Sequence, residues 1–374
     1  MIARKLNNEV EQNLFKGKAI VIIGPRQVGK TTLLRELVSH CDKRVLTLNC
    51  DEPEARDSLT GTNVAKLKAL IGDAELLVID EAQKVDNIGL ALKLIVDNIP
   101  AVQVVATGSS AFELHNRLNE PLTGRKFKYN MYPVSCGEII ETFGTIEERR
   151  TLENRLVYGS YPDIVMHPES SRQYLTDLTQ SYLYKDILSL NDLRKPQLLD
   201  KLLKALAFQI GSEVSTNELA RTLQSDNKTI EKYIDLLEKC YVIFRLGALS
   251  RNLRTELKRS KKIYFYDNGV RNAIIQQFAP AQSRNDMGAL WENFVIAERL
   301  KHNHYSKHYC NSYFWRTTLQ QEIDLVEECD GQMTAFEMKW NPTKRVSFSK
   351  SFLDAYDVKD TVVVTPENYL EYVA

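Results

Sequence analysis

Short apolar runs alternate with helix-like stretches along the first part of the chain. Residues 19–23 read Ala-Ile-Val-Ile-Ile, residues 76–79 read Leu-Leu-Val-Ile, and residues 102–106 are again mostly apolar. Continuous apolar runs of this length are typical of strands that a parallel sheet buries on both faces. We expect a helix over residues 30–40, directly after the first run. The pattern therefore predicts an α/β fold built on a parallel sheet for residues 1–165.

The middle of the chain, residues 166–267, has a helical pattern followed by strands. Residues 166–210 read as helical, and Ser215 and Asp226 stand where they can cap two further short helices. Apolar side chains recur at helical spacing in the second of these helices: Ile230, Ile234, Leu237 and Tyr241. Two strand-like runs follow, residues 242–246 and 263–266. This order is typical of a helix-turn-helix followed by a wing, so we expect a helical linker and a winged-helix domain.

Residues 268–374 predict a third domain of mixed elements. In chain order we expect a helix at 286–301, strands at 308–316, 322–327 and 334–340, a helix at 348–356 and a strand at 361–364. The order is αβββαβ, in which the second and third strands form a hairpin. Three domains suit a chain of 374 residues, because a typical domain has ~150 residues.

The first apolar run leads directly into the sequence GPRQVGKTT, which matches the phosphate-binding pattern GxxxxGK[ST] in full. Glycines let the backbone curl so that successive N–H groups face a phosphate, and the following helix directs the positive end of its dipole at the same anion. Lys30 adds a mobile positive charge toward the β- and γ-phosphates, and the Thr31 hydroxyl can ligate Mg²⁺. We therefore expect ATP and Mg²⁺ as cofactors. The residues expected to hold ATP are Gly24, Pro25, Arg26, Gln27, Val28, Gly29, Lys30, Thr31 and Thr32.

Two acids at the end of the second apolar run give an independent signal. Asp80 would hold Mg²⁺ together with Thr31, and Glu81 would act as the general base that polarises the attacking water. Gln83 follows closely, and a place in the same site and a surface position are equally compatible with the sequence. An apolar run that ends in two acids is common on its own, but after a phosphate-binding loop the two signals support each other.

The third apolar run ends in the small polar residues of ATGSS. A strand between the other two would bring Thr107 or Ser109 beside the γ-phosphate, where either could sense hydrolysis. The alternative is a plain strand-to-turn boundary, because glycine and serine are frequent in turns. We favour the functional interpretation, because catalytic groups gather at the carboxyl ends of such strands.

Taken together, GPRQVGKTTL, VIDEAQ and ATGSS resemble the AAA-type ATPases that carry a C-terminal DUF4143 domain. LTGRKFKYNMYPVS at residues 122–135 resembles the family's stretch Gly-Arg … Leu-Pro-Leu-Ser. GSYPD at residues 159–163 resembles its Gly-Gly-Tyr-Pro turn, with Ser160 in place of the second glycine. The resemblance covers essentially the whole chain. It implies an ATP-hydrolysing P-loop domain of the AAA/ASCE type, and it makes Arg125 and Pro162 candidate site residues.

Arg125 would sense or stabilise the charge of the γ-phosphate, in cis or across a subunit interface. A solvated arginine at the start of a strand is the alternative. By analogy with the family, Pro162 would line the adenine pocket; otherwise it closes a turn. Because AAA-type domains can form rings, the resemblance leaves a homo-oligomer open.

Alternating charged positions mark the hairpin predicted in the last domain. Glu322 and Asp324 share one face of a strand, and Glu337 and Lys339 share one face of the next. If the registers match, Asp324, Glu337 and Lys339 converge, so that two carboxylates can hold Mg²⁺ and the lysine can polarise a water for phosphodiester attack. With Glu292 on the preceding helix, these residues resemble the motif of the PD-(D/E)xK nuclease fold, to which DUF4143 is similar. Such a fold can keep its shape and lose its chemistry, so a binding module is the alternative.

DNA is the partner that the middle domain suggests. Residues 251–262 carry six basic residues and one acid, and a wing of this charge can contact phosphates. The second helix of the helix-turn-helix mixes Lys228 and Lys232 with acids, which suits insertion into a groove poorly. A packing or oligomerisation module is therefore the alternative to DNA contact.

Composition limits these interpretations. The 49 basic and 49 acidic residues balance, so any DNA-binding surface must be local. The six cysteines are scattered, which predicts single thiols in a reducing cytosol rather than a zinc site. The longest apolar runs hold about five residues, far short of the ~18–20 that span a bilayer. We therefore expect a cytoplasmic protein with no membrane partner.

Three functions remain open from the sequence. The first is an ATPase whose nucleotide cycle controls a DNA-associated, nuclease-like C-terminal domain. The second is an ATP-dependent switch whose C-terminal domain is catalytically inactive and binds protein or DNA. The third is a helicase-like motor with no nuclease role. All three require the P-loop. They differ in whether the acids of the last domain catalyse cleavage and in whether the basic wing contacts DNA.

Overall fold

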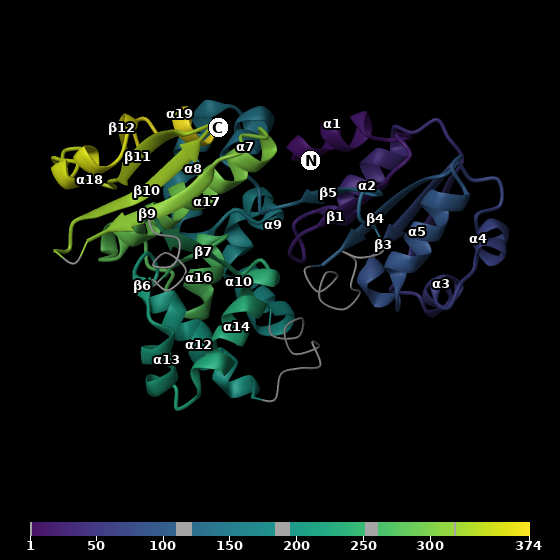
Figure 1. Ribbon diagram of the computed structural model, residues 1–374, viewed down its shortest axis with the longest axis horizontal. Helices are drawn as coiled ribbons and strands as arrows, with labels where there is room; N and C mark the ends of the chain where they lie inside the picture. The colour runs from purple at the N-terminus through teal and green to yellow at the C-terminus, as the bar shows by residue number, and fades with distance from the viewer. Residues whose placement is uncertain (1, 110–121, 184–194, 251–260, 318) are drawn as a thin grey trace.

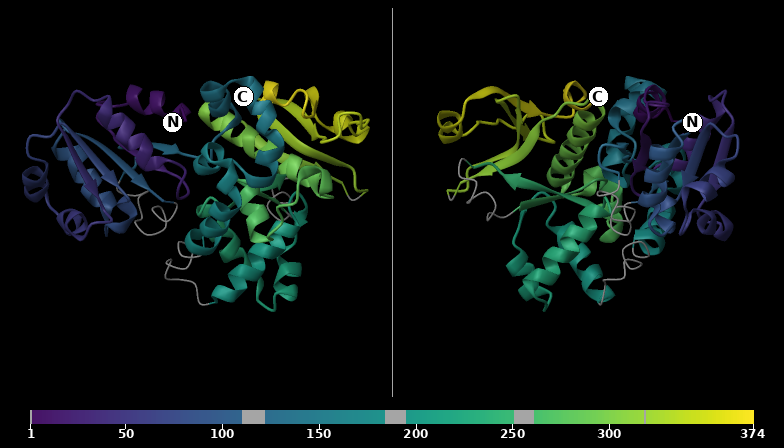
Figure 2. Two further views of the ribbon diagram at one scale, coloured as in Figure 1. Left: turned by 180° about the vertical axis from the view of Figure 1, so that it is seen from behind. Right: turned by 45° about the vertical axis from the view of Figure 1, so that its right-hand side comes forward.

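The computed structural model describes residues 2–109, 122–183, 195–250, 261–317 and 319–374. The elements form two lobes, each built on a β-sheet (Figure 1). Residues 2–109 and 122–130 make up the N-terminal lobe, and most of the described residues that follow make up the second. Two further views show the same separation (Figure 2). Among the described residues, no helix is both long and apolar enough to cross a membrane.

The sheet of the N-terminal lobe has five strands, and all of them run parallel. The strands are β1 (Ala19–Ile23), β2 (Val45–Asn49), β3 (Leu76–Asp80), β4 (Gln103–Gly108) and β5 (Lys126–Asn130). Their order across the sheet is β2-β3-β4-β1-β5. The predicted parallel sheet is confirmed, and β4 lies between the strand that precedes the P-loop and the strand that ends in Asp80.

Helices cover both faces of this sheet. Ile20 and Ile22 of β1 pack in one core with α1 and α2, whereas Val21 and Ile23 pack in a second core with α4 and α5. Successive side chains of a strand point to opposite faces, so one fully apolar run serves both cores. The helical elements of this lobe are α1 (Lys5–Gln12), α2 (Lys30–Ser39), α3 (Pro53–Leu59), α4 (Val64–Ile71), η1 (Ala82–Lys84) and α5 (Ile88–Asn98).

A series of helices leads from β5 into the second lobe. They are α7 (Cys136–Phe143), α8 (Thr145–Tyr158), α9 (Pro162–Met166), η2 (Pro168–Ser170), α10 (Ser171–Asp177), the π-helical η3 (Leu178–Leu183) and α12 (Pro196–Phe208).

Buried charges fasten α8 to α17 (Met287–Tyr305). Arg155 pairs with Glu148, and its Nη2 lies 3.5 Å from Oε1 of Glu298. Lys301 pairs with Glu298 at 2.8 Å, and the Tyr369 hydroxyl donates to Glu148 at 3.1 Å. All five side chains are buried, so this part of the fold depends on charges that neutralise one another.

Helices and strands are present where the sequence predicts a helix-turn-helix and a wing, and the winged-helix assignment itself stays a prediction. They are β6 (Glu213–Val214), α13 (Thr216–Thr222), α14 (Asn227–Lys239), β7 (Ile243–Ala248) and β8 (Lys261–Phe265). Ser215 and Asp226 cap the two helices by accepting from backbone N–H groups three residues ahead. β7 and β8 pair antiparallel, and β6 adds to the outer edge of β8. Most of the predicted basic segment, residues 251–260, lies outside the described residues.

The last part of the chain has the predicted order αβββαβ, followed by one further helix. The elements are α17, β9 (Asn311–Arg316), β10 (Glu322–Cys329), β11 (Gln332–Met338), α18 (Lys350–Ala355), β12 (Val358–Val364) and α19 (Leu370–Val373). β10 and β11 form the predicted antiparallel hairpin. α16 (Asn268–Ile274) and η4 (Ala281–Ser283) connect β8 to α17.

The strands β6, β7 and β8 belong to one seven-stranded sheet with the C-terminal strands β9 to β12. β7 runs parallel to β9, with Gly247 opposite Tyr313, and the order across the sheet is β12-β11-β10-β9-β7-β8-β6. In both views of Figure 2 the teal helices α12, α13 and α14 lie below this sheet. The sheet crosses the domain boundary predicted at residue 267, and the three-domain division stays a prediction.

The expectation of six single cysteines is wrong for two of them. Cys310 and Cys329, 19 residues apart in sequence, form a disulfide. The reason is topological, because the antiparallel pairing of β9 with β10 brings the start of one strand to the end of the other. The remaining cysteines are free thiols, of which Cys50, Cys136 and Cys240 are buried and Cys41 is half-buried.

Candidate functional site

The loop between β1 and α2 has the backbone geometry of a phosphate-binding turn. Gly29 has a φ of 99° and Gln27 a φ of 61°, in the left-handed region where a side chain is strained. A Cβ at Gly24 would lie 2.1 Å from the carbonyl oxygen of Met131. Glycine is therefore required at both fixed positions of the GxxxxGK[ST] pattern, at one for backbone conformation and at the other for space.

The ammonium group of Lys30 folds over this loop. Its Nζ donates to the carbonyl oxygens of Gly24 at 3.0 Å and Pro25 at 2.7 Å, and the side chain is buried. The charge is thus held directly above the turn whose N–H groups would face an anion.

Arg4, near the start of the chain, braces the loop from outside. It donates to the carbonyl oxygen of Val28, to that of Tyr132 at 2.7 Å and to the Glu138 carboxylate at 2.9 Å. Burial alone would lower the pKa of Arg4, but the carboxylate of Glu138 more than offsets this and raises it. This role could not be predicted, because a lone arginine before the first strand belongs to no motif.

Asp80 is the centre of a hydrogen-bond network at the carboxyl ends of β3 and β4. The Thr31 hydroxyl donates to its Oδ2 at 2.8 Å, and the Thr107 hydroxyl donates to its Oδ1. The backbone N–H of Glu81 donates to Oδ1 as well, at 3.0 Å. Asp80 and Thr107 are buried. The structure therefore brings together the two predicted Mg²⁺ ligands, Thr31 and Asp80, and one of the two predicted sensor residues.

Gln83 links Glu81, the predicted general base, to Ser109, the other predicted sensor residue. Its Nε2 donates to the Glu81 carboxylate, and its Oε1 accepts from the backbone N–H of Ser109 at 3.1 Å. Of the two interpretations that the sequence left open for Gln83, the structure supports a place in the site. Ser109 contributes its backbone N–H to this contact.

Arg125 lies at the wrong end of the sheet for a role in cis. It precedes β5, its carbonyl accepts from Ala19 N at 2.9 Å, and its Nε pairs with Asp97 at 2.6 Å. Because β1 and β5 are parallel, the P-loop follows the opposite end of β1, about 13 Å away at ~3.3 Å per residue. The prediction in cis is therefore wrong, and a role across a subunit interface stays a prediction. Pro162 begins α9 and is half-buried, and its role at adenine also stays a prediction.

A second cluster of polar side chains lies on the hairpin β10–β11. Nζ of Lys339 lies 3.2 Å from Oδ2 of Asp324 and 2.6 Å from Oε2 of Glu337. The backbone N–H of Met338 also donates to Asp324, at 2.9 Å. The ladder pairs Leu325 with Phe336, so the next position along it sets Asp324 opposite Glu337, as the predicted convergence requires.

Glu292 of α17 joins this cluster through a lysine that was predicted to contact DNA. Lys262 Nζ lies 3.0 Å from Glu292 and also pairs with Glu322, and the Tyr264 hydroxyl donates to Glu292 at 2.7 Å. Lys262 is 1% exposed. Its assignment to the DNA-binding wing is therefore wrong, because its position in β8 turns the side chain into the interior toward two acids.

Burial and mutual repulsion affect the acids of this cluster. Burial, with the neighbouring charge of Asp324, raises the pKa of Glu292 to about 7 and that of Glu337 to about 7. Burial would lower the pKa of Lys339, but Asp324 and Glu337 more than compensate and raise it. The cluster is a set of carboxylates in an interior site, where each charge needs a partner.

Three segments of the chain match known protein families. Residues 16–140 match the family described as AAA domain, and residues 287–372 match the domain of unknown function DUF4143. We refer to these two segments as the AAA domain and the DUF4143 domain, after the families that they match. The residues between them, 149–281, match a further domain of unknown function, DUF8612.

Several relatives align with most of this chain. The chain is 27% identical over 344 residues to uncharacterized proteins of Mycobacterium tuberculosis (Rv2008c) and Mycobacterium bovis (Mb2031c), which covers 90% of this chain and 73% of each relative. An uncharacterized Haemophilus influenzae protein is 26% identical over 75% of this chain and 74% of its own. A solved structure of the Aeropyrum pernix ORC1 protein in complex with DNA shares 13% identity at a TM-score of 0.36, over 74% of this chain and 93% of that chain. A likeness this remote carries nothing about function.

Between the AAA and DUF4143 domains, the charges of α14 are partly neutralised from β7. Arg245 pairs with Asp235 at 2.6 Å and with Glu238. The exposed charges of this helix include Lys228, Lys232 and Glu231. The surface of α14 is therefore more basic than the sequence of the helix suggests.

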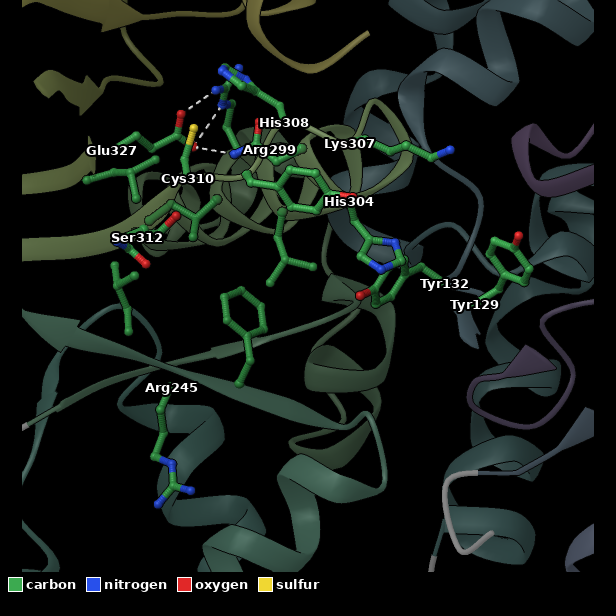
Figure 3. A pocket seen from close by; sticks show the side chains of 18 of the residues that line it. Tyr129, Tyr132, Arg245, Arg299, His304, Lys307, His308, Cys310, Ser312 and Glu327 are labelled. Carbon is green, nitrogen blue, oxygen red and sulfur yellow. Dashed lines mark hydrogen bonds and ion pairs between the residues drawn. The ribbon is translucent and has the colours of Figure 1, made fainter. Parts of the chain in front are cut away.

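A cavity of about 480 Å³ lies where the AAA domain meets the DUF4143 domain (Figure 3). Tyr129 lines it from β5, Arg245 from β7 and His304 from α17, while His308 and Cys310 line it from the segment that leads into β9. These residues come from distant parts of the chain and form no sequence motif, so only the packing of the lobes reveals the cavity.

Proposed function

We propose that the AAA domain binds ATP with Mg²⁺ and hydrolyses it, and that this nucleotide cycle controls a DNA-associated, nuclease-like DUF4143 domain. The observation that carries the proposal is the Asp80 network, in which Thr31, Asp80 and Thr107 are hydrogen-bonded at the end of a P-loop. A carboxylate beside the P-loop threonine is the arrangement that a nucleotide-bound Mg²⁺ requires. The deciding experiment measures Mg²⁺-dependent ATP turnover by the full chain, with and without DNA.

The residues at the loop fit these cofactors. The loop N–H groups and Lys30 would bind the phosphates, and Thr31 and Asp80 offer adjacent oxygens for Mg²⁺, which would neutralise phosphate charge. Glu81 would orient the attacking water and accept its proton. The amide of Gln83 holds the Glu81 carboxylate in place from one side and the backbone of Ser109 from the other. This couples the general base to the end of β4, where a change in the phosphates can be transmitted.

Glu81→Gln is expected to bind ATP normally and to hydrolyse it about 10²–10⁴-fold more slowly, because an amide cannot accept a proton from water. Retained ATP in a filter-binding assay, together with lost phosphate release, checks the prediction. Glu54→Gln, an exposed acid-to-amide change on α3, serves as the matched control and should leave both measurements unchanged. Equal turnover in Glu81→Gln would remove Glu81 as the base.

The DUF4143 cluster supports a metal-dependent nuclease site. Asp324 and Glu337 offer two carboxylates on adjacent strands, Glu292 lies near enough to Asp324 for the two charges to repel, and Lys339 is placed to polarise a water. Asp324→Asn is expected to lower Mg²⁺- or Mn²⁺-dependent nicking of plasmid DNA at least about a hundredfold, because loss of a metal ligand costs several kcal/mol of transition-state stabilisation. Agarose gels of plasmid DNA incubated with each metal check the prediction. The control is Asp330→Asn, in the exposed turn after β10.

One observation favours the second candidate, a nucleotide switch with an inactive DUF4143 domain. Two lysine ammonium groups, from Lys262 and Lys339, lie among the four acids and pair with all of them. A cluster neutralised in this way can be purely structural. If the wild-type chain cuts no DNA with any divalent metal while it still hydrolyses ATP, the switch becomes the better assignment.

DNA contact would fall to the middle of the chain. The exposed lysines of α14 and Lys261 at the start of β8 offer positive charge on the surface, and phosphate contacts need no more than that. Stimulation of ATP turnover by DNA would connect this surface to the AAA domain. A homo-oligomer stays part of the proposal only through Arg125, which would have to act on the nucleotide of a neighbouring subunit.

A further inference from the structure

The disulfide links the residue before β9 to the last residue of its neighbour β10. The ladder pairs Asn311 with Glu328, so the next position along it sets Cys310 opposite Cys329, with their Cα atoms 4.5 Å apart. Both side chains are half-buried, within reach of solvent. A cysteine pair at this position can therefore exchange with a soluble thiol.

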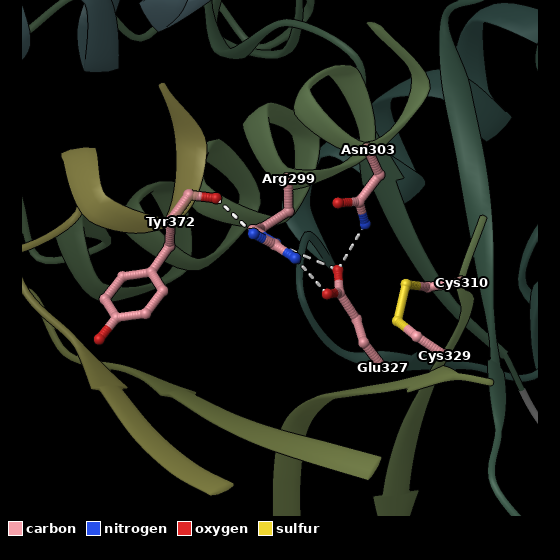
Figure 4. Close-up of a disulfide and its surroundings, with 6 residues drawn as sticks. All are labelled: Arg299, Asn303, Cys310, Glu327, Cys329 and Tyr372. Atoms are coloured by element: carbon pink, nitrogen blue, oxygen red, sulfur yellow. Dashed lines mark hydrogen bonds and ion pairs between the residues drawn. A yellow bond between two sulfur atoms is a disulfide. The ribbon is translucent and has the colours of Figure 1, made fainter. Parts of the chain in front are cut away.

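The surroundings hold the two cysteines in place whether or not they are bonded. Glu327, two residues before Cys329, accepts from Arg299 Nε at 3.1 Å and from Asn303 Nδ2 at 2.8 Å (Figure 4). Arg299 in turn donates to the carbonyl oxygen of Tyr372. These contacts anchor the end of β10 to α17, so reduction of the disulfide leaves the two thiols opposite each other.

His308 completes a set of three metal-ligating side chains. A ring nitrogen of His308 and the two sulfur atoms all lie within 4.8 Å of one another. In the part of the chain that the structure describes, no other three histidine, cysteine or acidic side chains come this close. Asp324 is five residues from Cys329 on the same strand, about 17 Å away, so this cluster is separate from the DUF4143 carboxylates.

We propose that His308, Cys310 and Cys329 form a redox-controlled site for a thiophilic divalent cation, Zn²⁺. Two thiolates and one neutral imidazole are ligands that zinc prefers, and three protein ligands leave the fourth position for water. Because His308 is exposed, that position is open to solvent. In the oxidised chain the sulfur atoms are joined to each other and no longer offer thiolates, so the site holds zinc only when it is reduced.

The conversion between the two states is balanced by ordinary thiol chemistry. A small dithiol reductant delivers two electrons and two protons, the S–S bond breaks into two thiols, and the reductant closes to its own disulfide. Zinc binding then displaces the two thiol protons. In the reverse direction hydrogen peroxide accepts the two electrons from the thiolates and two protons from solvent. Its O–O bond breaks to give two waters, the S–S bond forms and Zn²⁺ leaves.

The site lies at the edge of the cavity between the AAA and DUF4143 domains. His308 and Cys310 line that cavity (Figure 3), and both states link β9 to β10 at the same place. The fold is therefore retained in either state, and the difference is a cation at the cavity wall. This inference concerns a different part of the chain from the P-loop and does not depend on ATP hydrolysis.

The test uses the full chain, reduced with a phosphine, freed of reductant without air and titrated with Co²⁺ and then Zn²⁺. We expect one equivalent of Co²⁺ with the thiolate-to-cobalt charge-transfer absorption of a sulfur-ligated site, which Zn²⁺ abolishes. The same chain after peroxide treatment should show no such absorption. Absence of binding in the reduced chain, or equal binding after oxidation, would overturn the proposal.

Variants assign the ligands. Cys329→Ser should lose the charge-transfer absorption, and His308→Ala should weaken zinc binding at least about tenfold, since even loss of a residue that only supports a ligand costs that much. Cys41→Ser, at a half-buried free cysteine elsewhere, is the matched control and should bind as the wild type does. Absorption that persists in Cys329→Ser or disappears in Cys41→Ser would place the metal on other thiols and sink the proposal. Protection of Cys310 and Cys329 by Zn²⁺ against alkylation, measured by mass spectrometry on the wild-type chain, decides the matter if a variant fails to fold.

Discussion

Replacing Lys30 with alanine is expected to lower ATP turnover about 10²–10³-fold, the loss typical of a preorganised charge that stabilises a transition state. The physical reason is the position of the ammonium group. It lies above the P-loop, held by the carbonyl oxygens of Gly24 and Pro25, where the β- and γ-phosphates would be. Without it, the charge that builds up on the transferred phosphoryl group has no protein cation beside it. Phosphate release under saturating ATP measures the effect.

The control separates a catalytic loss from a folding defect. Lys43→Ala removes a lysine of the same domain that makes only a surface ion pair with Glu75, and turnover should be unchanged. The circular dichroism spectra of both variants should match that of the wild type. If folded Lys30→Ala turns over ATP at the normal rate, the assignment of an ATPase site at this loop fails.

The AAA domain could be predicted closely from the sequence because its signals are local. A fully apolar run predicts a strand buried on both faces, and β1, β3 and β4 are such strands. The position of β4 between β3 and β1 was only a condition for Thr107 or Ser109 to reach the γ-phosphate, and the order of the strands meets that condition. A P-loop confines its ligands to a few consecutive residues, so the motif alone places Lys30 and Thr31.

Contacts between distant segments that share no sequence motif could not be predicted. Arg4 braces the P-loop across 24 residues of sequence, to Val28, and no spacing rule links the two. Arg125 became a candidate through the family resemblance, but the direction of β5 places it at the end of the strands opposite the P-loop. The pairing of Cys310 with Cys329 and the junction of β7 with β9 likewise depend on strand pairing that only the folded chain reveals.

Charge was the least predictable property. Lys262 reads as part of a basic run, yet it is buried between Glu292 and Glu322. Equal numbers of acids and bases in the composition do not reveal which of them pair inside the protein. In this chain several pairs are buried where α8, β8 and α17 meet, and an interior pair acts on stability quite differently from a surface pair.

The variant Arg155→Met tests whether the buried ion pairs stabilise the second lobe. It should lower the free energy of unfolding of this lobe by about 3–5 kcal/mol. Arg155 is 2% exposed and pairs with Glu148 and Glu298, which are 0% and 1% exposed. Methionine fills similar space but leaves two buried carboxylates with less compensation. Glu298 keeps Lys301, whereas Glu148 keeps the neutral hydroxyl of Tyr369. The penalty should therefore arise mainly at Glu148.

Fluorescence reports this effect selectively, because the three tryptophans of the chain, Trp291, Trp315 and Trp340, all lie in the DUF4143 domain. The expected result is a clear shift of the tryptophan unfolding midpoint to lower denaturant concentration. Arg150→Met is the matched control, since Arg150 lies on the same helix, is exposed and pairs with the half-buried Glu147 at the surface. Its unfolding midpoint should hardly move. Adding Glu148→Gln to Arg155→Met should recover part of the lost stability, because it removes the unpaired charge itself. If Arg155→Met and Arg150→Met unfold at the same midpoint, the buried network does not hold the lobe together.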